Sequence, residues 1–152
     1  MPVFDPDEFF RFANQLVQDN PNEAALRSAI SRAYYACHLV ARDQLFGVDH
    51  AGLTSGARKR IAPGPAGKSE HKVVQLAVGQ NRTFRSSVHL RLENKLGQLQ
   101  SMREAADYLR NTDHVGVVGV FTAHGVRDWA GLARASLTLA SDLLPEVHLL
   151  KP

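Results

Sequence analysis

The sequence predicts an all-α protein: an antiparallel, up-and-down helical bundle of four long helices and one short helix, in a single domain over residues 1–152. Three observations favour this fold. Apolar residues recur at steps of three and four along most of the chain, which places them on one face of each helix. Gly and Pro gather between these stretches. A chain of this length has the size of one ordinary domain, and its core is large enough to fold without a disulfide or a metal.

The composition predicts a cytoplasmic protein. The 44% of hydrophobic residues is normal for a globular chain. Cys37 is the single cysteine and falls on a predicted core face, so we expect a buried structural thiol rather than a nucleophile. The first residues are acidic and do not resemble a signal peptide, and no apolar run approaches the roughly 20 residues that span a membrane. We therefore expect no membrane partner and no cofactor.

The first two helices have clear boundaries in the sequence. The run D-P-D-E at 5–8 is typical of a helix start and predicts a helix over 6–18. Asn22 is a suitable cap for a second helix over 23–45, a stretch without Gly or Pro. The apolar stripe of this second helix predicts its buried face, and consists of Leu26, Ile30, Ala33, Cys37 and Val40.

The same second helix carries polar groups on its other faces. Two neighbouring lines hold these groups, and they consist of Arg27, Ser31, Tyr34 and His38, and of Ser28, Arg32 and Tyr35. A helix with both a core stripe and a row of Arg, Tyr and His side chains is the natural place to look for function.

The middle of the chain is basic. Seven of the 22 residues at 47–68 are Gly or Pro, which predicts a long loop, and Ser69 can cap a short helix over 70–78. Residues 51–91 carry a net charge of +7, which would attract a polyanion. A solvated basic loop explains the same pattern. The candidate nucleic-acid-binding residues are Arg58, Lys59, Arg60, Lys68, Lys72, Arg82 and Arg85.

Two more long helices complete the prediction. The first covers 87–111, and Gly97 inside it is either a weak point or a mark of close helix contact. The glycine-containing apolar run at 112–121 is expected to be a linker rather than a strand. The last helix covers 122–144 and is expected to end at Pro145. The apolar stripe of the first of these helices consists of Val88, Leu92, Leu96, Leu99, Met102, Ala106 and Leu109.

Three segments together resemble the signatures of small prokaryotic HEPN-domain proteins. The run R-S-A-I-S-R-A-Y-Y-A-C-H at 27–38 resembles the signature of their second helix. The run E-H-K-V-V at 70–74 resembles the start of their third helix, and R-E-A-A-D-Y at 103–108 resembles a segment late in their fourth. Order and spacing agree, and the resemblance covers about residues 5–145.

The resemblance implies a HEPN-type bundle, often a homodimer, and frequently encoded beside a nucleotidyltransferase in toxin–antitoxin or defence systems. Many members are metal-independent ribonucleases whose site is an Arg followed, after four to six residues, by a His. This chain departs from that pattern, because Tyr108, Leu109 and Arg110 occupy the positions after Arg103 where the His should fall. Arg82 and His89 fit the spacing but lie outside the usual segment, so we attribute that pair to chance.

Two interpretations of the polar residues stay open. Metal-free RNA cleavage needs a base, an acid and a cation on the phosphate, and His38, His71, Arg32 and Arg103 could supply them. Alternatively, a structural polar network joins two helices, with the residues Arg32, Tyr35, Arg103, Asp107 and Tyr108. No zinc motif is present, because the histidines lack close partners at ligand spacing and there is no cysteine pair.

We therefore carry three hypotheses from the sequence. The first is a nucleotide- or RNA-associated binding module with a nucleotidyltransferase-type antitoxin as partner. The second is a metal-independent, toxin-like ribonuclease with a variant active site. The third is a purely structural protein–protein interaction domain that assembles through the apolar run at 112–121 and the stripe of the helix before it.

Overall fold

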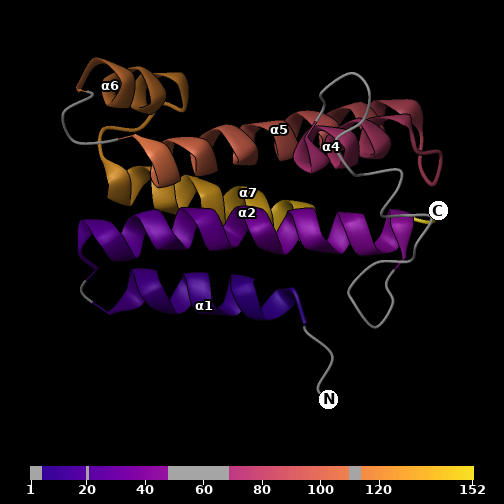
Figure 1. Ribbon diagram of the computed structural model, residues 1–152, viewed down its shortest axis with the longest axis horizontal. Helices are drawn as coiled ribbons and strands as arrows, with labels where there is room; N and C mark the ends of the chain where they lie inside the picture. Colours follow the sequence, from indigo (N-terminus) through magenta and orange to yellow (C-terminus); the bar gives the residue numbers. More distant parts are fainter. Residues whose placement is uncertain (1–4, 20, 48–68, 110–113) are drawn as a thin grey trace.

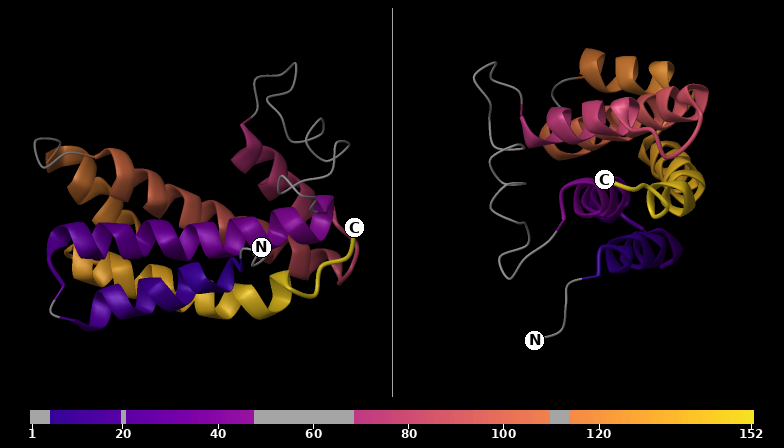
Figure 2. Two further views of the ribbon diagram at one scale, coloured as in Figure 1. Left: turned by 60° about the horizontal axis from the view of Figure 1, so that its bottom comes forward. Right: turned by 90° about the vertical axis from the view of Figure 1, so that its right-hand side faces the viewer.

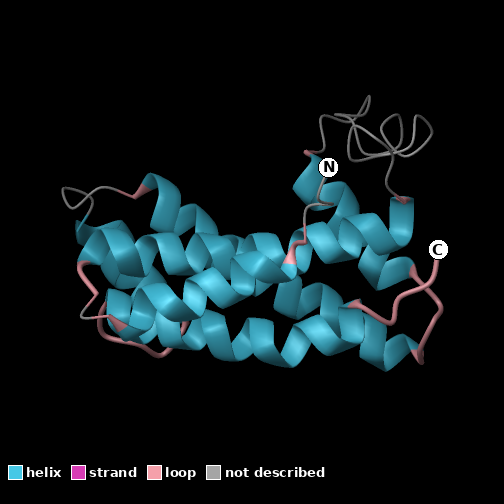
Figure 3. Ribbon diagram, turned by 90° about the horizontal axis from the view of Figure 1, so that it is seen from below, coloured by secondary structure: helices cyan, strands magenta, loops and turns pink. Residues whose placement is uncertain are grey.

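The computed structural model describes residues 5–19, 21–47, 69–109 and 114–152. These residues form helices and connecting loops, with no strand among them (Figure 3). The predicted all-α class is therefore confirmed. The six described helices are α1 (Asp7–Gln18), α2 (Glu23–Phe46), α4 (Glu70–Gln80), α5 (Ser86–Tyr108), α6 (His114–Ala123) and α7 (Trp129–Val147).

The longest helix, α2, lies in the middle of the packing. It contacts α1 on one side and α5 and α7 on the other, and these helices run roughly along one long axis (Figures 1 and 2). The short α4 packs on α5 and also reaches α2. At the opposite end of the molecule, α6 lies over the C-terminal end of α5 (Figure 1). No helix among the described residues has the length and apolar character that a membrane crossing would need.

Side-chain caps set where several helices begin. Asn22 accepts a hydrogen bond from the Ala25 amide at 2.9 Å, and Ser69 accepts one from the Lys72 amide at 3.3 Å. Both residues were expected to cap, because their side chains satisfy amides that lack a partner in the first helical turn. The prediction for the starts of α2 and α4 is confirmed.

The predicted apolar stripe of α2 is buried along its whole length. Burial extends beyond this stripe, because helices pack on α2 from several sides. Tyr34 and His38 were expected on a polar row, yet their exposed fractions are 0% and 1%. Polar groups in such a position need internal hydrogen-bond partners.

A close approach of α4 to α5 holds the N-terminal turn of α4 near α2. A Cβ atom on Gly97 would lie 2.6 Å from the side-chain nitrogen of Gln75, so the glycine allows this approach. The same Gln75 nitrogen donates to the Glu93 carbonyl at 3.4 Å. Of the two sequence interpretations of Gly97, the structure supports a close helix contact.

The prediction of an apolar linker over 112–121 is wrong for the part of it that the structure describes, since residues 114–123 form the helix α6. Val117, Val120 and Phe121 pack against the core, and the Phe121 ring meets Trp129 at 5.2 Å in an edge-to-face arrangement. Packing of this kind offsets the cost of glycines in a helix, and local sequence does not reveal it.

The expected boundaries of the last helix are also wrong. The chain turns at Gly125, whose φ of 66° lies in the left-handed region, and Asp128 caps a helix that starts at Trp129 rather than near 122. The helix continues through Pro145 to Val147. A proline near a helix end loses only its own amide, and the His148 amide still donates to the Leu144 carbonyl at 3.0 Å.

Two glycine substitutions test the helical assignment of α6. At Gly119 no atom lies within 4 Å of an added Cβ, so Gly119→Ala should raise the free energy of unfolding by about 0.5–1 kcal/mol. Gly125→Ala is the matched control, and should lower it by about 1–2 kcal/mol because of the left-handed φ. Urea unfolding followed by circular dichroism measures both. Equal destabilisation by the two variants would contradict a helix at 114–123.

Candidate functional site

Aromatic and imidazole rings from α2 and α4 meet beside α5. We call Tyr34, Tyr35, His38 and His71 the ring cluster. The two histidine rings lie 4.6 Å apart between centroids, and Tyr34 stacks on His38 at 5.5 Å. Tyr35 meets His71 at 6.0 Å, nearly edge-on. The cluster therefore joins the middle of α2 to the first turn of α4.

The tautomer of His71 follows from its hydrogen bond with Tyr34. The Tyr34 oxygen lies 2.7 Å from His71 Nδ1. Burial raises the pKa of the Tyr34 phenol, so the hydroxyl keeps its proton. We assign this hydroxyl as the hydrogen-bond donor to Nδ1, because the described residues give it no other acceptor. Burial, together with the nearby His38 and Arg103, lowers the pKa of His71 to about 4. At neutral pH the His71 imidazole is uncharged and carries its proton on Nε2.

The second imidazole, His38, is tied to the start of α4. His38 Nε2 lies 3.1 Å from Glu70 Oε1, and Arg42 Nη1 lies 3.6 Å from the same oxygen. The hydrogen bond from His38 lowers the pKa of the Glu70 carboxyl group. Within the described part of the chain, His38 Nδ1 is buried without a hydrogen-bond partner. Glu70 therefore orders both side chains and stays ionised.

Arg103 lies among three tyrosines at the C-terminal half of α5. Its guanidinium carbon is 5.4 Å from the Tyr34 ring centroid and 5.7 Å from those of Tyr35 and Tyr108. Nη1 lies 3.4 Å from both the Asp107 carboxylate and the Tyr108 hydroxyl. Nε is buried and lacks a hydrogen-bond partner among the described residues. One loose carboxylate contact leaves much of this charge unneutralised.

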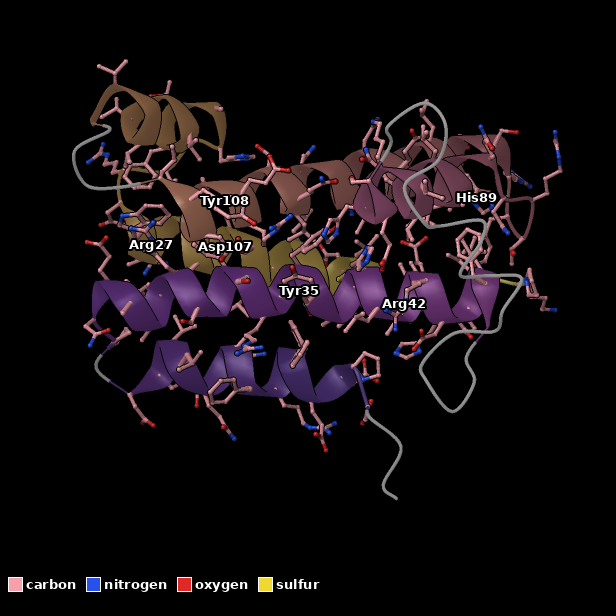
Figure 4. All side chains as sticks on the ribbon, viewed as in Figure 1. Arg27, Tyr35, Arg42, His89, Asp107 and Tyr108 are labelled. Carbon is pink, nitrogen blue, oxygen red and sulfur yellow. The ribbon has the colours of Figure 1, made fainter. Side chains whose placement is uncertain are left out.

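We call Arg103, Tyr35, Asp107 and Tyr108 the arginine–tyrosine face. Figure 4 shows the last three on one side of the molecule, where α2 and α5 run together. Burial disfavours the charge on Arg103, but Tyr35, Tyr108 and Asp107 outweigh it and raise the pKa of the guanidinium group. Tyr108 is 70% exposed, so one aromatic wall of this face is open to a ligand.

The structure brings together four of the five residues predicted to form the polar network, and they are those of the arginine–tyrosine face. The fifth, Arg32, points to α1 instead: its guanidinium carbon lies 4.9 Å from the Phe9 ring and 6.0 Å from the Phe12 ring. Among the catalytic candidates, His38, His71 and Arg103 lie close together, and Arg32 does not join them.

The predicted nucleic-acid-binding residues are divided. Arg58, Lys59, Arg60 and Lys68 lie outside the described residues. Lys72, at the start of α4, is exposed, and so are Arg82 and Arg85 before α5. Since α5 has 23 residues, about 35 Å separates these two arginines from Tyr108. The described structure therefore places part of the basic charge at the other end of α5 from the arginine–tyrosine face.

Arg27 has a role that the sequence did not reveal. It donates from Nε to the Ala106 carbonyl at 2.7 Å and from Nη2 to the Leu109 carbonyl, and it lies 4.7 Å from the Trp129 ring centroid. A cation at this position satisfies carbonyls that the helix end leaves free. Arg27 thus fixes the end of α5 next to Tyr108. Its place at the start of the HEPN-like signature was the signal available.

His89 is a structural residue. It is buried, its Nδ1 donates to the Val78 carbonyl at 3.0 Å, and its Nε2 accepts from the Phe84 amide at 2.8 Å. Both ring nitrogens are occupied in joining α4 to α5, at the far end from Tyr108 (Figure 4). This is consistent with attributing its spacing from Arg82 to chance. Across the described ranges, no three His, Cys, Asp or Glu side chains gather where they could hold a metal ion.

The protonation state of His71 can be measured directly. We expect its imidazole NMR signals, assigned with the His71→Asn variant, to titrate near pH 4 rather than near 6.5. The unfolded chain then binds the extra proton between these values, so the free energy of unfolding falls as pH is lowered from 6.5 toward 4. His71→Asn, which keeps an acceptor for Tyr34, should flatten this slope. An inflection near 6.5 would refute the half-buried, neutral imidazole.

The chain was compared with protein-family models, curated proteins and solved structures, and none of the three comparisons finds a match. The functional argument for this chain therefore rests on its own residues.

Proposed function

We propose that this chain is a HEPN-like up-and-down helical bundle that acts as a nucleotide- or RNA-associated binding module through the arginine–tyrosine face. The observation that carries the proposal is the guanidinium group of Arg103 surrounded by tyrosine rings, one of which is largely exposed. Guanidinium groups bind phosphate, and exposed aromatic rings stack on unpaired bases. The guanidinium group and the exposed ring together suit a ligand that carries both a phosphate and an unpaired base.

The donors on and beside this face support binding of an anion. The charge of Arg103 has one loose carboxylate contact, and in the neighbouring ring cluster the neutral His71 carries a proton on Nε2. Neither group can act as an acceptor in this state. The excess of positive charge in residues 51–91 adds a sequence-independent attraction for a polyanion.

The same geometry argues against the ribonuclease alternative. A general base needs an accessible nitrogen lone pair within reach of the 2′-hydroxyl. The lone pair of His71 is occupied by Tyr34, and the free lone pair of His38 lies on a ring that is 1% exposed. Both imidazoles are better explained as supports that hold α4 against α2.

Binding can be tested with a fluorescently labelled single-stranded RNA of about 12 nucleotides and fluorescence anisotropy. Tyr108→Ala should weaken binding about tenfold, because one stacked base contributes about 1–3 kcal/mol. Tyr108 is exposed, so the variant should keep its fold. Arg103→Gln should weaken binding further, since it removes the buried charge.

Two variants serve as matched controls for this experiment. Leu90→Ala removes another exposed apolar side chain of α5, and Arg11→Gln on α1 removes an arginine that pairs with Asp5 at 3.2 Å. Both should leave the affinity within about twofold, as expected for surface positions away from the site. If the wild type fails to bind RNA and nucleotides, or if Tyr108→Ala binds as well as Leu90→Ala, the proposal is wrong.

Incubation of the purified chain with total RNA separates binding from cleavage. We expect the RNA to remain intact at high protein concentration, both with and without a chelator, because neither His38 nor His71 offers an accessible lone pair. Cleavage that is lost in His38→Ala and in Arg103→Ala would favour the ribonuclease alternative instead.

Two partners follow from the HEPN-like signatures. One is a second copy of the chain, and the other is a nucleotidyltransferase-type antitoxin. Co-expression with a nucleotidyltransferase encoded nearby and light scattering of the purified complex would test both.

An interaction domain is a second candidate, favoured by α6. Val115 and Val118 on this helix are 87% and 44% exposed, and the helix has no charged residue. Exposed apolar helices of this kind often form contacts with other proteins. If this were the sole function, the RNA experiment above would find no binding by the wild type.

A further inference from the structure

We infer that the groove between α5 and α6 is a base-binding site that prefers guanine. The inference rests on the proposed function and deepens it by naming the nucleotide. Its lining joins four residues of α5 and the residue that follows this helix to one residue of α6, and they are Ser101, Glu104, Ala105, Tyr108, Leu109 and Val120.

The shape and lining of the groove suit a flat heterocycle. Its volume is about 360 Å³, within the range of small-molecule sites. Ala105, Leu109 and Val120 provide apolar surface, and Tyr108 adds an exposed aromatic ring on which a base can stack. Such a lining leaves selectivity to the few polar groups present.

Glu104 is the charged group of the groove. Its side chain is exposed, and Oε1 accepts one hydrogen bond from Gln100 at 3.1 Å. An ionised carboxylate is an acceptor on both oxygens and has no donor. It therefore pairs best with an edge that presents two adjacent donors.

Among the common bases, guanine alone presents two adjacent N–H donors, at N1 and at the 2-amino group. Adenine and cytosine each place an acceptor nitrogen beside their amino group, which a second carboxylate oxygen would repel. Uracil has a single N–H between two carbonyl oxygens. The carboxylate of Glu104 therefore selects guanine by matching both of its donors, and Ser101 adds a hydroxyl at the same groove.

Tyr108 connects this groove with the arginine–tyrosine face. Its ring lines the groove, while its hydroxyl lies 3.4 Å from Arg103 Nη1. A nucleotide that stacks its base on Tyr108 would thus carry its phosphate toward a guanidinium group whose carbon is 5.7 Å from the ring centroid. One nucleotide could therefore place its base against the ring of Tyr108 and its phosphate near Arg103.

The test is isothermal titration calorimetry of the full chain with GMP, IMP, AMP and CMP at fixed salt. GMP should bind at least about tenfold more tightly than AMP or CMP, because one bidentate carboxylate contact contributes about 1–3 kcal/mol of discrimination. IMP lacks the 2-amino donor and should fall between GMP and AMP. Equal affinities for all four nucleotides would overturn the guanine preference.

Substitutions of groove residues test whether the groove causes the preference for guanine. Glu104→Gln should lower the affinity for GMP about tenfold and raise the affinity for AMP, since its amide group replaces one of the two acceptors with a donor. Ser101→Trp, at an exposed position, should fill the groove and weaken all four nucleotides. Glu8→Gln on α1 is the charge-matched control and should change nothing.

The outcomes separate this inference from the proposed function. If RNA binds through Tyr108 and Arg103 but Glu104→Gln keeps the GMP affinity and the order of the nucleotides, the guanine site is wrong and the binding module stands. If none of the four nucleotides binds and RNA also fails to bind, both are wrong. Binding of GMP that survives Ser101→Trp would place the base elsewhere.

Discussion

The central position of α2 is the constraint on which the rest of the structure depends. A helix packed on several sides buries part of its polar rows together with its apolar stripe, so Tyr34 and His38 must find partners inside the protein. The partners come from the first turn of α4, where His71 accepts from Tyr34 and Glu70 pairs with His38. The position of α4 and the protonation state of His71 therefore follow from a single packing arrangement.

The parts of the fold that depend on local sequence could be predicted. The apolar stripe of α2 and the caps at Asn22 and Ser69 were identified because periodicity and capping act within one or two turns. The segment at 112–121 was misassigned because its helix depends on the contact of Phe121 with Trp129, which lies in the next helix. No local pattern announces a contact of that kind.

The candidate site was predictable to a similar degree. Arg103, Asp107 and Tyr108 lie at steps of four and one along a helix, so their proximity could be read from spacing. The spacing could not predict which arginine of α2 would contact the end of α5. Arg27 reaches the carbonyls there, while Arg32, little more than a turn further, lies against Phe9 of α1. The choice depends on the rotation of α2 between its neighbours, which spacing does not supply.

The length of α5 determines which ligands can use the whole surface. The arginine–tyrosine face lies at one end of this helix, while Arg82 and Arg85 lie before its start, about 35 Å away. A mononucleotide can reach only one of these ends, so its affinity reports on Tyr108 and its neighbours alone. A longer strand can also reach the basic end, where counterion release makes binding depend on salt. Stacking and charge are therefore separated along one helix, and ligands of different length measure them separately.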